Sequence, residues 1–169
     1  MRKHAGPVQP KKHLGQHFLK DTSIAERIAG SVNTPPEQTL LEIGPGTGAL
    51  TRPLLETGRT CIEVVEIDRD SVAYLNAQDW VHANRIVIHE GDMLKWGPED
   101  WDRVATGQPF AIVGNFPYNI SSQIMFRALD LGERIVELTG MFQKEVAERI
   151  CALPGNRSYG ILSVLMQAH

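Results

Sequence analysis

Hydrophobic and polar positions along this chain form two alternating patterns. Short apolar runs rich in β-branched residues predict strands buried on both faces, and longer segments with apolar residues three or four positions apart predict amphipathic helices. Because the two kinds of segment follow one another in turn, the pattern predicts an α/β fold, with a mainly parallel sheet and helices on both faces. The predicted strands are residues 39–43, 60–66, 85–90, 110–115 and 135–142, and the predicted helices are residues 22–31, 49–56, 70–79, 120–131, 144–153 and 160–169.

Individual residues set some of these boundaries. The first helix is expected to be capped by Asp21 or Thr22 and to end before the prolines at 35 and 36. The β-branched run of the strand at 60–66 continues to Ile67, which indicates burial on both faces. Residues 97–108 form the loosest internal stretch.

Length and charge predict one compact domain preceded by a basic arm. The chain has 169 residues, 42% of them hydrophobic, and its formal charge of -3 argues against a protein that coats nucleic acid through bulk electrostatics. Residues 1–20 contain basic side chains and no acid, so they form the arm, and residues 21–169 form the domain. We expect Lys11 and Lys12 to neutralise nucleic-acid phosphates, the alternative being a solvated tail.

Cysteine and histidine positions predict no metal site. Cys61 and Cys151 lie far apart in apolar stretches, which predicts buried free thiols in a reducing compartment. The histidines lack the spacing of metal ligands. No apolar run approaches the length of a membrane span, and the N-terminus is charged where a secretory signal needs an apolar core, so we expect a cytoplasmic protein.

A glycine-rich segment follows the first predicted strand and precedes a helix. Gly44, Gly46 and Gly48 allow a sharp turn close to a ligand, and the helix that follows offers unpaired N–H groups, although a plain tight turn has the same composition. Pro45 and the Gly-x-Gly-x-Gly spacing argue against the pyrophosphate cradle of a dinucleotide site, whose spacing is Gly-x-Gly-x-x-Gly. A nicotinamide enzyme remains an alternative.

Two acids lie at the ends of the next two strands. Glu66 ends the second strand, where an acid of this topology accepts hydrogen bonds from the two hydroxyls of a ribose. Asp92 follows the third strand and is positioned to accept a hydrogen bond from the exocyclic amine of a cofactor base, the alternative being a solvated loop acid. Together with the glycines, these acids indicate a nucleoside-containing cofactor.

Asn115, Phe116, Pro117 and Tyr118 end the fourth strand, at the edge of a parallel sheet where ligands collect. A plain β-turn would contain the same residue types. The chemical interpretation explains all four: the Asn115 side-chain oxygen and the Phe116 carbonyl accept the hydrogens of an adenine amine and free its lone pair for attack. Pro117 makes the turn rigid, and Tyr118 offers a face on which the base stacks. Positioning against an electrophilic donor supplies most of the rate, and the adenine must be flipped or unpaired.

These segments resemble one family, the ribosomal RNA adenine dimethyltransferases, which includes the dimethyladenosine transferases of the small subunit and the erythromycin-resistance methylases. The resemblance runs from about Lys11 to Gln167 and is closer to the small-subunit enzymes. The segments that carry it are Gly-Gln-His-Phe-Leu at 15–19, Glu-Ile-Gly-Pro-Gly at 42–46, Val-Glu-Ile-Asp at 65–68, Gly-Asp-Met at 91–93, Asn-Phe-Pro-Tyr-Asn-Ile-Ser at 115–121, Gln-Lys-Glu-Val at 143–146 and Tyr-Gly-Ile-Leu-Ser-Val at 159–164.

The resemblance implies a Rossmann-like class I methyltransferase fold with strand order 3-2-1-4-5 and S-adenosyl-L-methionine as cofactor. It also implies two successive methyl transfers to adenine amines of ribosomal RNA, in ribosome biogenesis. The cofactor-binding residues it implies are Gln16, His17, Leu19, Gly44, Gly46, Glu66, Asp92, Met93 and Asn115. The chain departs from the family at position 17, which is usually Asn, and at position 116, which is usually Leu.

Family members continue with two further strands and a small helical RNA-binding domain, so we expect this chain to be a fragment with an open edge at its fifth strand. We expect a monomer that binds the cofactor and has weak or no RNA methylation, with edge pairing as a route to a dimer. A large-subunit resistance methylase and a non-catalytic nucleic-acid-binding factor on the same scaffold remain the alternative functions.

Overall fold

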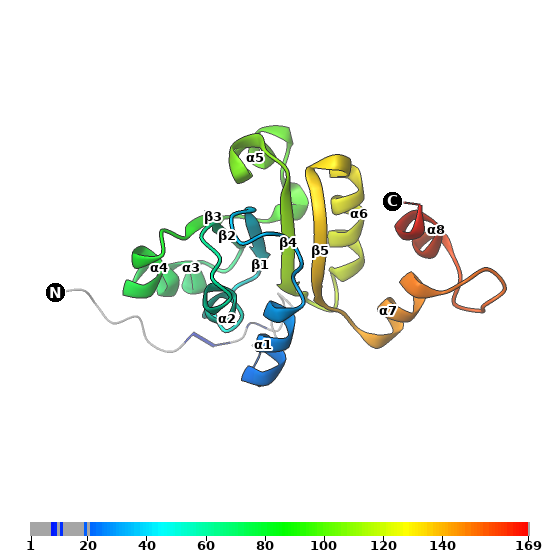
Figure 1. Ribbon diagram of the computed structural model, residues 1–169, viewed down its shortest axis with the longest axis horizontal. Coiled ribbons are helices and arrows are strands. Elements are labelled where there is room, and N and C mark those ends of the chain that lie inside the picture. Colours follow the sequence, from blue (N-terminus) through cyan, green and yellow to red (C-terminus); the bar gives the residue numbers. More distant parts are fainter. Residues whose placement is uncertain (1–7, 10, 12–18, 20, 169) are drawn as a thin grey trace.

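The computed structural model describes residues 8, 9, 11, 19 and 21–168. A five-stranded sheet of order β3-β2-β1-β4-β5 lies at the centre of this part of the chain (Figure 1), and all neighbouring strands in it run parallel. The predicted strand order is confirmed. The strands are β1 (Leu40–Ile43), β2 (Ile62–Glu66), β3 (Val87–Glu90), β4 (Phe110–Asn115) and β5 (Ile135–Met141).

Alternate residues of the central strands enter two separate cores, one on each face of the sheet. On one face, Leu40 and Val64 belong to the same buried cluster as side chains from the loop and helices between residues 22 and 83. These helices are α1 (Thr22–Gly30), α2 (Thr51–Glu56), α3 (Arg69–Asn76) and α4 (Asp79–Ala83). On the other face, Leu41 and Val65 pack in a second cluster with α5 (Pro98–Arg103) and α6 (Ser121–Leu131). The prediction of helices on both faces is confirmed.

The last two helices lie apart from the sheet. α7 (Lys144–Cys151) and α8 (Ile161–Gln167) pack on each other, at the opposite end of the molecule from α4 (Figure 1). Among the described residues, no helix is both long enough and apolar enough to cross a membrane.

Short helices occupy stretches for which the sequence predicted none. The stretch 97–108 contains α5 and the 3-10 helix η3 (Val104–Gly107), and it buries Trp101 and Val104 almost completely. The Asp100 carboxylate accepts a hydrogen bond from the Gly97 N–H at 3.0 Å, which begins α5, but one turn and a half is too short to show a hydrophobic period. The 3-10 helices η2 (Met93–Lys95) and η4 (Gly132–Arg134) complete the elements.

Three burial predictions are wrong. Ile67 is 45% exposed, because β2 ends at Glu66 and the next residue already leaves the sheet. Cys61 and Cys151 are free thiols as predicted, but both are exposed. Cys61 lies just before the first residue of β2, and Cys151 ends α7, a helix in which no residue is buried.

Candidate functional site

The glycine turn after β1 is held by the backbone conformation of its glycines. Gly44 and Gly46 have φ values of 68° and 57°, in the left-handed region that side chains disfavour. A Cβ on Gly44 would have no atom within 4 Å, so the space in front of this residue is open to a ligand. A Cβ on Gly48 would lie 2.6 Å from the Trp80 ring, so the turn is packed closely from behind by α4.

Glu66 ends β2 with its carboxylate fixed by two backbone donors. Its Oε2 accepts a hydrogen bond from the Gly46 N–H at 3.0 Å, and its Oε1 accepts one from the Asp68 N–H at 2.9 Å. Burial is the main effect that raises the pKa of Glu66, and the negative charge of Asp68 raises it further. A carboxylate has about four lone-pair sites, so this fixed group can accept two further hydrogen bonds from a ligand.

Glu42, in the middle of β1, is a second buried carboxyl group near that of Glu66. The Thr51 hydroxyl donates to its Oε2 at 2.6 Å, and the side chain is fully buried. Burial raises the pKa of Glu42 to about 8, and the charge of Glu66 contributes to the increase. Glu42 therefore carries a proton at neutral pH in the free protein, where an ordinary glutamate would be ionised.

This buried carboxyl group predicts a pH-dependent stability. Because the pKa of Glu42 is about 8 in the folded chain and near 4.5 in the unfolded chain, its contribution is complete below pH 4.5 and is lost as the pH rises towards 8. We expect this group alone to lower the free energy of unfolding by about 1.4 kcal/mol per pH unit inside that window. Denaturant unfolding across the window should show a flatter pH dependence for Glu42→Gln, and an unchanged slope would contradict the expectation.

The turn after β3 places Asp92 at the next strand end. The Gly91 N–H donates to the Glu66 carbonyl at 2.9 Å, so the chain leaves β3 alongside the end of β2. Asp92 caps η2 through a hydrogen bond from the Leu94 N–H to its Oδ1 at 3.1 Å. From the far side, the guanidinium of Arg127 on α6 donates to the Leu94 carbonyl at 2.7 Å and holds the turn.

The segment at 115–118 leaves β4 with its phenylalanine seated in a slot. The Phe116 side chain is 1% exposed, and its ring lies 4.8 Å from that of Phe142, measured between centroids. Two glycines on neighbouring strands make room for this ring: a Cβ on Gly114 would lie 2.8 Å from it, and a Cβ on Gly140 would lie 2.4 Å from it. The buried ring thus fixes the main chain of residue 116 at the edge of the sheet.

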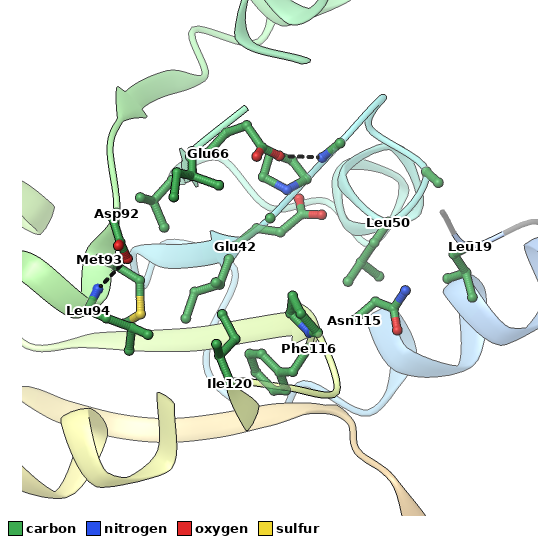
Figure 2. Close-up of a pocket in the computed structure, with 18 of the residues that line it drawn as sticks. Leu19, Glu42, Leu50, Glu66, Asp92, Met93, Leu94, Asn115, Phe116 and Ile120 are labelled. Carbon is green, nitrogen blue, oxygen red and sulfur yellow. Dashed lines mark hydrogen bonds between the residues drawn. The ribbon is translucent and has the colours of Figure 1, made fainter. Parts of the chain in front are cut away.

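One pocket brings most of the predicted residues together (Figure 2). Glu42 and Glu66 point into it from neighbouring strands, and Asp92 and Asn115 lie on opposite sides of it in this view. Tyr118 is 48% exposed at its rim. The predicted residues that line the pocket are Leu19, Gly44, Gly46, Glu66, Asp92, Met93, Asn115, Phe116, Pro117 and Tyr118.

Three predicted residues, Lys12, Gln16 and His17, lie outside the part of the chain that the structure describes. Lys11 lies within it, and its ammonium group pairs with the carboxylates of Asp68 and Asp70 at 2.5 and 2.7 Å. Its predicted contact with nucleic-acid phosphates stays a prediction.

Sequence reasoning gave no role to several residues of this pocket. Glu42 is the clearest, and the sequence did contain a signal for it: a charged residue in the middle of an otherwise apolar strand. Leu50, Leu94 and Ile120 also line the pocket, but their sequence pattern does not distinguish them from ordinary core residues.

The sheet order, the glycine turn after the first strand and the acids after the second and third define a Rossmann-like protein of the methyltransferase type. Solved structures agree. The chain is similar to a dimethyladenosine transferase from Plasmodium falciparum, with a TM-score of 0.71 and 28% identity over 89% of this chain and 52% of that one. It is also similar to the 23S rRNA methyltransferase ErmE, with a TM-score of 0.63 and 30% identity over 79% of this chain and 50% of that one.

The chain belongs to the ribosomal RNA adenine dimethylase family, whose model matches residues 8–169. A relative from Phocaeicola vulgatus, called ribosomal RNA small subunit methyltransferase A, is 51% identical over 163 residues. That alignment covers 96% of this chain and 56% of the relative, so the chain spans little more than half of the relative's length.

Proposed function

We propose that this chain binds S-adenosyl-L-methionine and contains the site at which methyl groups are transferred to the exocyclic amines of adenines in small-subunit ribosomal RNA. The observation that carries the proposal is the shared pocket: Asn115 and Phe116 line it together with the glycine turn and the carboxylates of Glu66 and Asp92. A nucleoside-containing donor and an adenine acceptor therefore have recognition groups within one cavity. The name of the 51% identical relative supports the choice of the small subunit.

The residues present fit this cofactor. The open space before Gly44 leaves room for a ligand beside the glycine turn, and the fixed carboxylate of Glu66 suits two ribose hydroxyls. Asp92 would accept from the amine of the cofactor base, with Met93 and Leu19 as apolar contacts at the same pocket. S-adenosyl-L-methionine, when bound, supplies an electrophilic methyl group on a positively charged sulfur. We propose that Gln16 and His17, which the family resemblance also implies, contact the cofactor as well.

Acceptor activation depends on two oxygens at the end of β4. The adenine amine is a weak nucleophile because its lone pair is delocalised into the ring. The Asn115 side-chain oxygen and the Phe116 carbonyl would each accept one of its hydrogens, which favours tetrahedral geometry and localises the lone pair on nitrogen. Tyr118, half exposed at the rim, offers its ring to a flipped or unpaired base. No strong general base is needed, since the nitrogen loses its proton easily once it carries the new methyl group and a positive charge.

Glu66→Ala provides the test on the cofactor side. We expect the substitution to weaken S-adenosyl-L-methionine binding by about tenfold to a hundredfold, because two hydrogen bonds to a charged acceptor are lost. Isothermal titration calorimetry measures this directly, with Glu99→Ala on the surface helix α5 as a control that should bind normally. Titration with a nicotinamide dinucleotide belongs in the same experiment, and tighter binding of that ligand would overturn the proposed cofactor.

Large-subunit RNA is the second candidate substrate, favoured by the 30% identity to ErmE. Incubation of the protein with labelled cofactor separates these two candidate substrates. Each RNA, small-subunit or large-subunit, is offered both naked and assembled into particles. A non-catalytic binding factor is less well supported, because the acids and the amide still line one pocket.

The remaining assignments are part of the same proposal. We propose that the protein acts in the cytoplasm as a monomer during ribosome biogenesis, that residues 1–20 form an arm which caps the cofactor, and that residues 21–169 form the catalytic domain. Lys12 in that arm is proposed to contact RNA phosphates.

A further inference from the structure

Three carboxylates crowd the end of β2 and the start of α3, beside the pocket. Glu66 ends the strand, Asp68 caps the helix and Asp70 lies in its first turn. The Asp68 side chain is completely buried, and its Oδ1 accepts a hydrogen bond from the Asp70 N–H at 3.2 Å. Its own N–H donates to Glu66, so the two buried carboxylates are joined through the main chain. Adjacent buried negative charges repel each other strongly unless a cation is near.

Lys11 supplies that cation from a distant part of the sequence. Its ammonium donates to Asp68 Oδ1 at 2.5 Å, 57 positions later in the chain, and pairs with Asp70 Oδ2 at 2.7 Å. The hydrogen bonds to Asp68 and Asp70 raise the pKa of Lys11, so it stays charged at any physiological pH. A lysine bound to two carboxylates has lost much of its attraction for a phosphate group.

We propose that Lys11 is a positioning residue for the cofactor, which neutralises Asp68 so that Glu66 keeps its charge and its orientation towards the ribose. This inference rests on the proposed function, because it assigns Lys11 to the cofactor side of the reaction and not to RNA binding. Asp68 connects Lys11 to Glu66 in two ways. Its backbone N–H donates a hydrogen bond that orients the Glu66 carboxylate, and its negative charge raises the pKa of Glu66. Among the residues that the structure describes, the charged and titratable groups that interact in this cluster include Glu42 from β1, Glu66 from β2, Asp68 and Asp70 from α3, and Lys11.

The decisive experiment measures S-adenosyl-L-methionine affinity by calorimetry for Lys11→Met, Asp68→Asn and the double variant. Lys11→Met should weaken binding about tenfold at pH 6 and less at pH 8, because the unneutralised pair of carboxylates takes up a proton more readily at low pH. Asparagine keeps the helix cap at position 68 but carries no charge. The double variant should therefore recover most of the lost affinity and show only the pH dependence of the unsubstituted chain, a pattern that a simple structural tether would not produce. Lys144→Met, which removes an exposed lysine of α7, is the matched control.

The salt dependence of RNA binding separates this role from a phosphate contact. If Lys11 neutralised a phosphate, its removal would reduce the slope of log affinity against log salt by about 0.7 to 0.9. We expect an unchanged slope. Normal cofactor affinity in Lys11→Met, or no recovery in the double variant, would overturn the inference, whereas absence of binding in the unsubstituted chain would overturn the proposed function itself.

Discussion

Asn115→Ala is expected to slow methyl transfer to ribosomal RNA by about a hundredfold to a thousandfold, the usual effect of removing one hydrogen-bonding group that acts on the reacting atoms. Alanine deletes the side-chain oxygen that would accept a hydrogen of the adenine amine. Binding of S-adenosyl-L-methionine should change only a few-fold, because the proposed contacts of Glu66 and Asp92 with the adenosine part would remain.

Single-turnover transfer with protein in excess over small-subunit RNA measures this effect and detects even slow reactions. Asn76→Ala is the matched control, since this asparagine is exposed at the end of α3, outside the pocket. An unchanged transfer rate in Asn115→Ala would contradict the acceptor role. An equal loss of cofactor affinity would assign Asn115 to cofactor binding alone.

Gly140→Ala is expected to destabilise the fold by about 3 kcal/mol, at the upper end of what overpacking of a core costs. Gly140 lies on β5 opposite Gly114 of β4. The added methyl group would lie 2.3 Å from the Gly114 carbonyl oxygen and 2.4 Å from the Phe116 ring. Backbone atoms in a sheet cannot move aside cheaply, so strands β4 and β5 must separate or the ring must leave its slot.

Chemical denaturation measures the change in the free energy of unfolding. Gly30→Ala is the control, because this glycine ends α1 and a Cβ there would have no neighbour within 4 Å. That variant should be neutral or slightly more stable, since alanine favours the helix. Equal stability of both variants would show that β4 and β5 adjust to the added carbon.

The sequence predicted the sheet and the location of the site because both depend on local patterns. Apolar β-branched runs identify the buried strands, and the carboxyl ends of parallel strands meet at one edge, so Glu66, Asp92 and Asn115 had to lie near one another. Tertiary contacts determine the short elements that the sequence pattern did not predict. Residues 104–107 form η3, whose Ala105 N–H donates to Glu63 on β2 at 3.0 Å, and a partner 42 positions away leaves no local pattern.

The ion pairs of Lys11 could not be predicted from the sequence pattern either. The cluster of basic residues at the N-terminus indicated an RNA contact for Lys11, but the position of Asp68 and Asp70 relative to this lysine follows from the fold. In the same way, the exposure of Cys61 depends on where β2 begins, and strand boundaries are uncertain by a residue or two in any pattern.

The slot that holds Phe116 has a consequence for how this protein tolerates mutation. The proposed acceptor oxygen at this position belongs to the main chain, so every amino acid supplies it, and the side chain matters there only through the shape that keeps this oxygen in place. We therefore expect large apolar side chains to be able to replace one another at position 116, whereas the two glycines beneath the ring cannot change without moving this edge of the pocket.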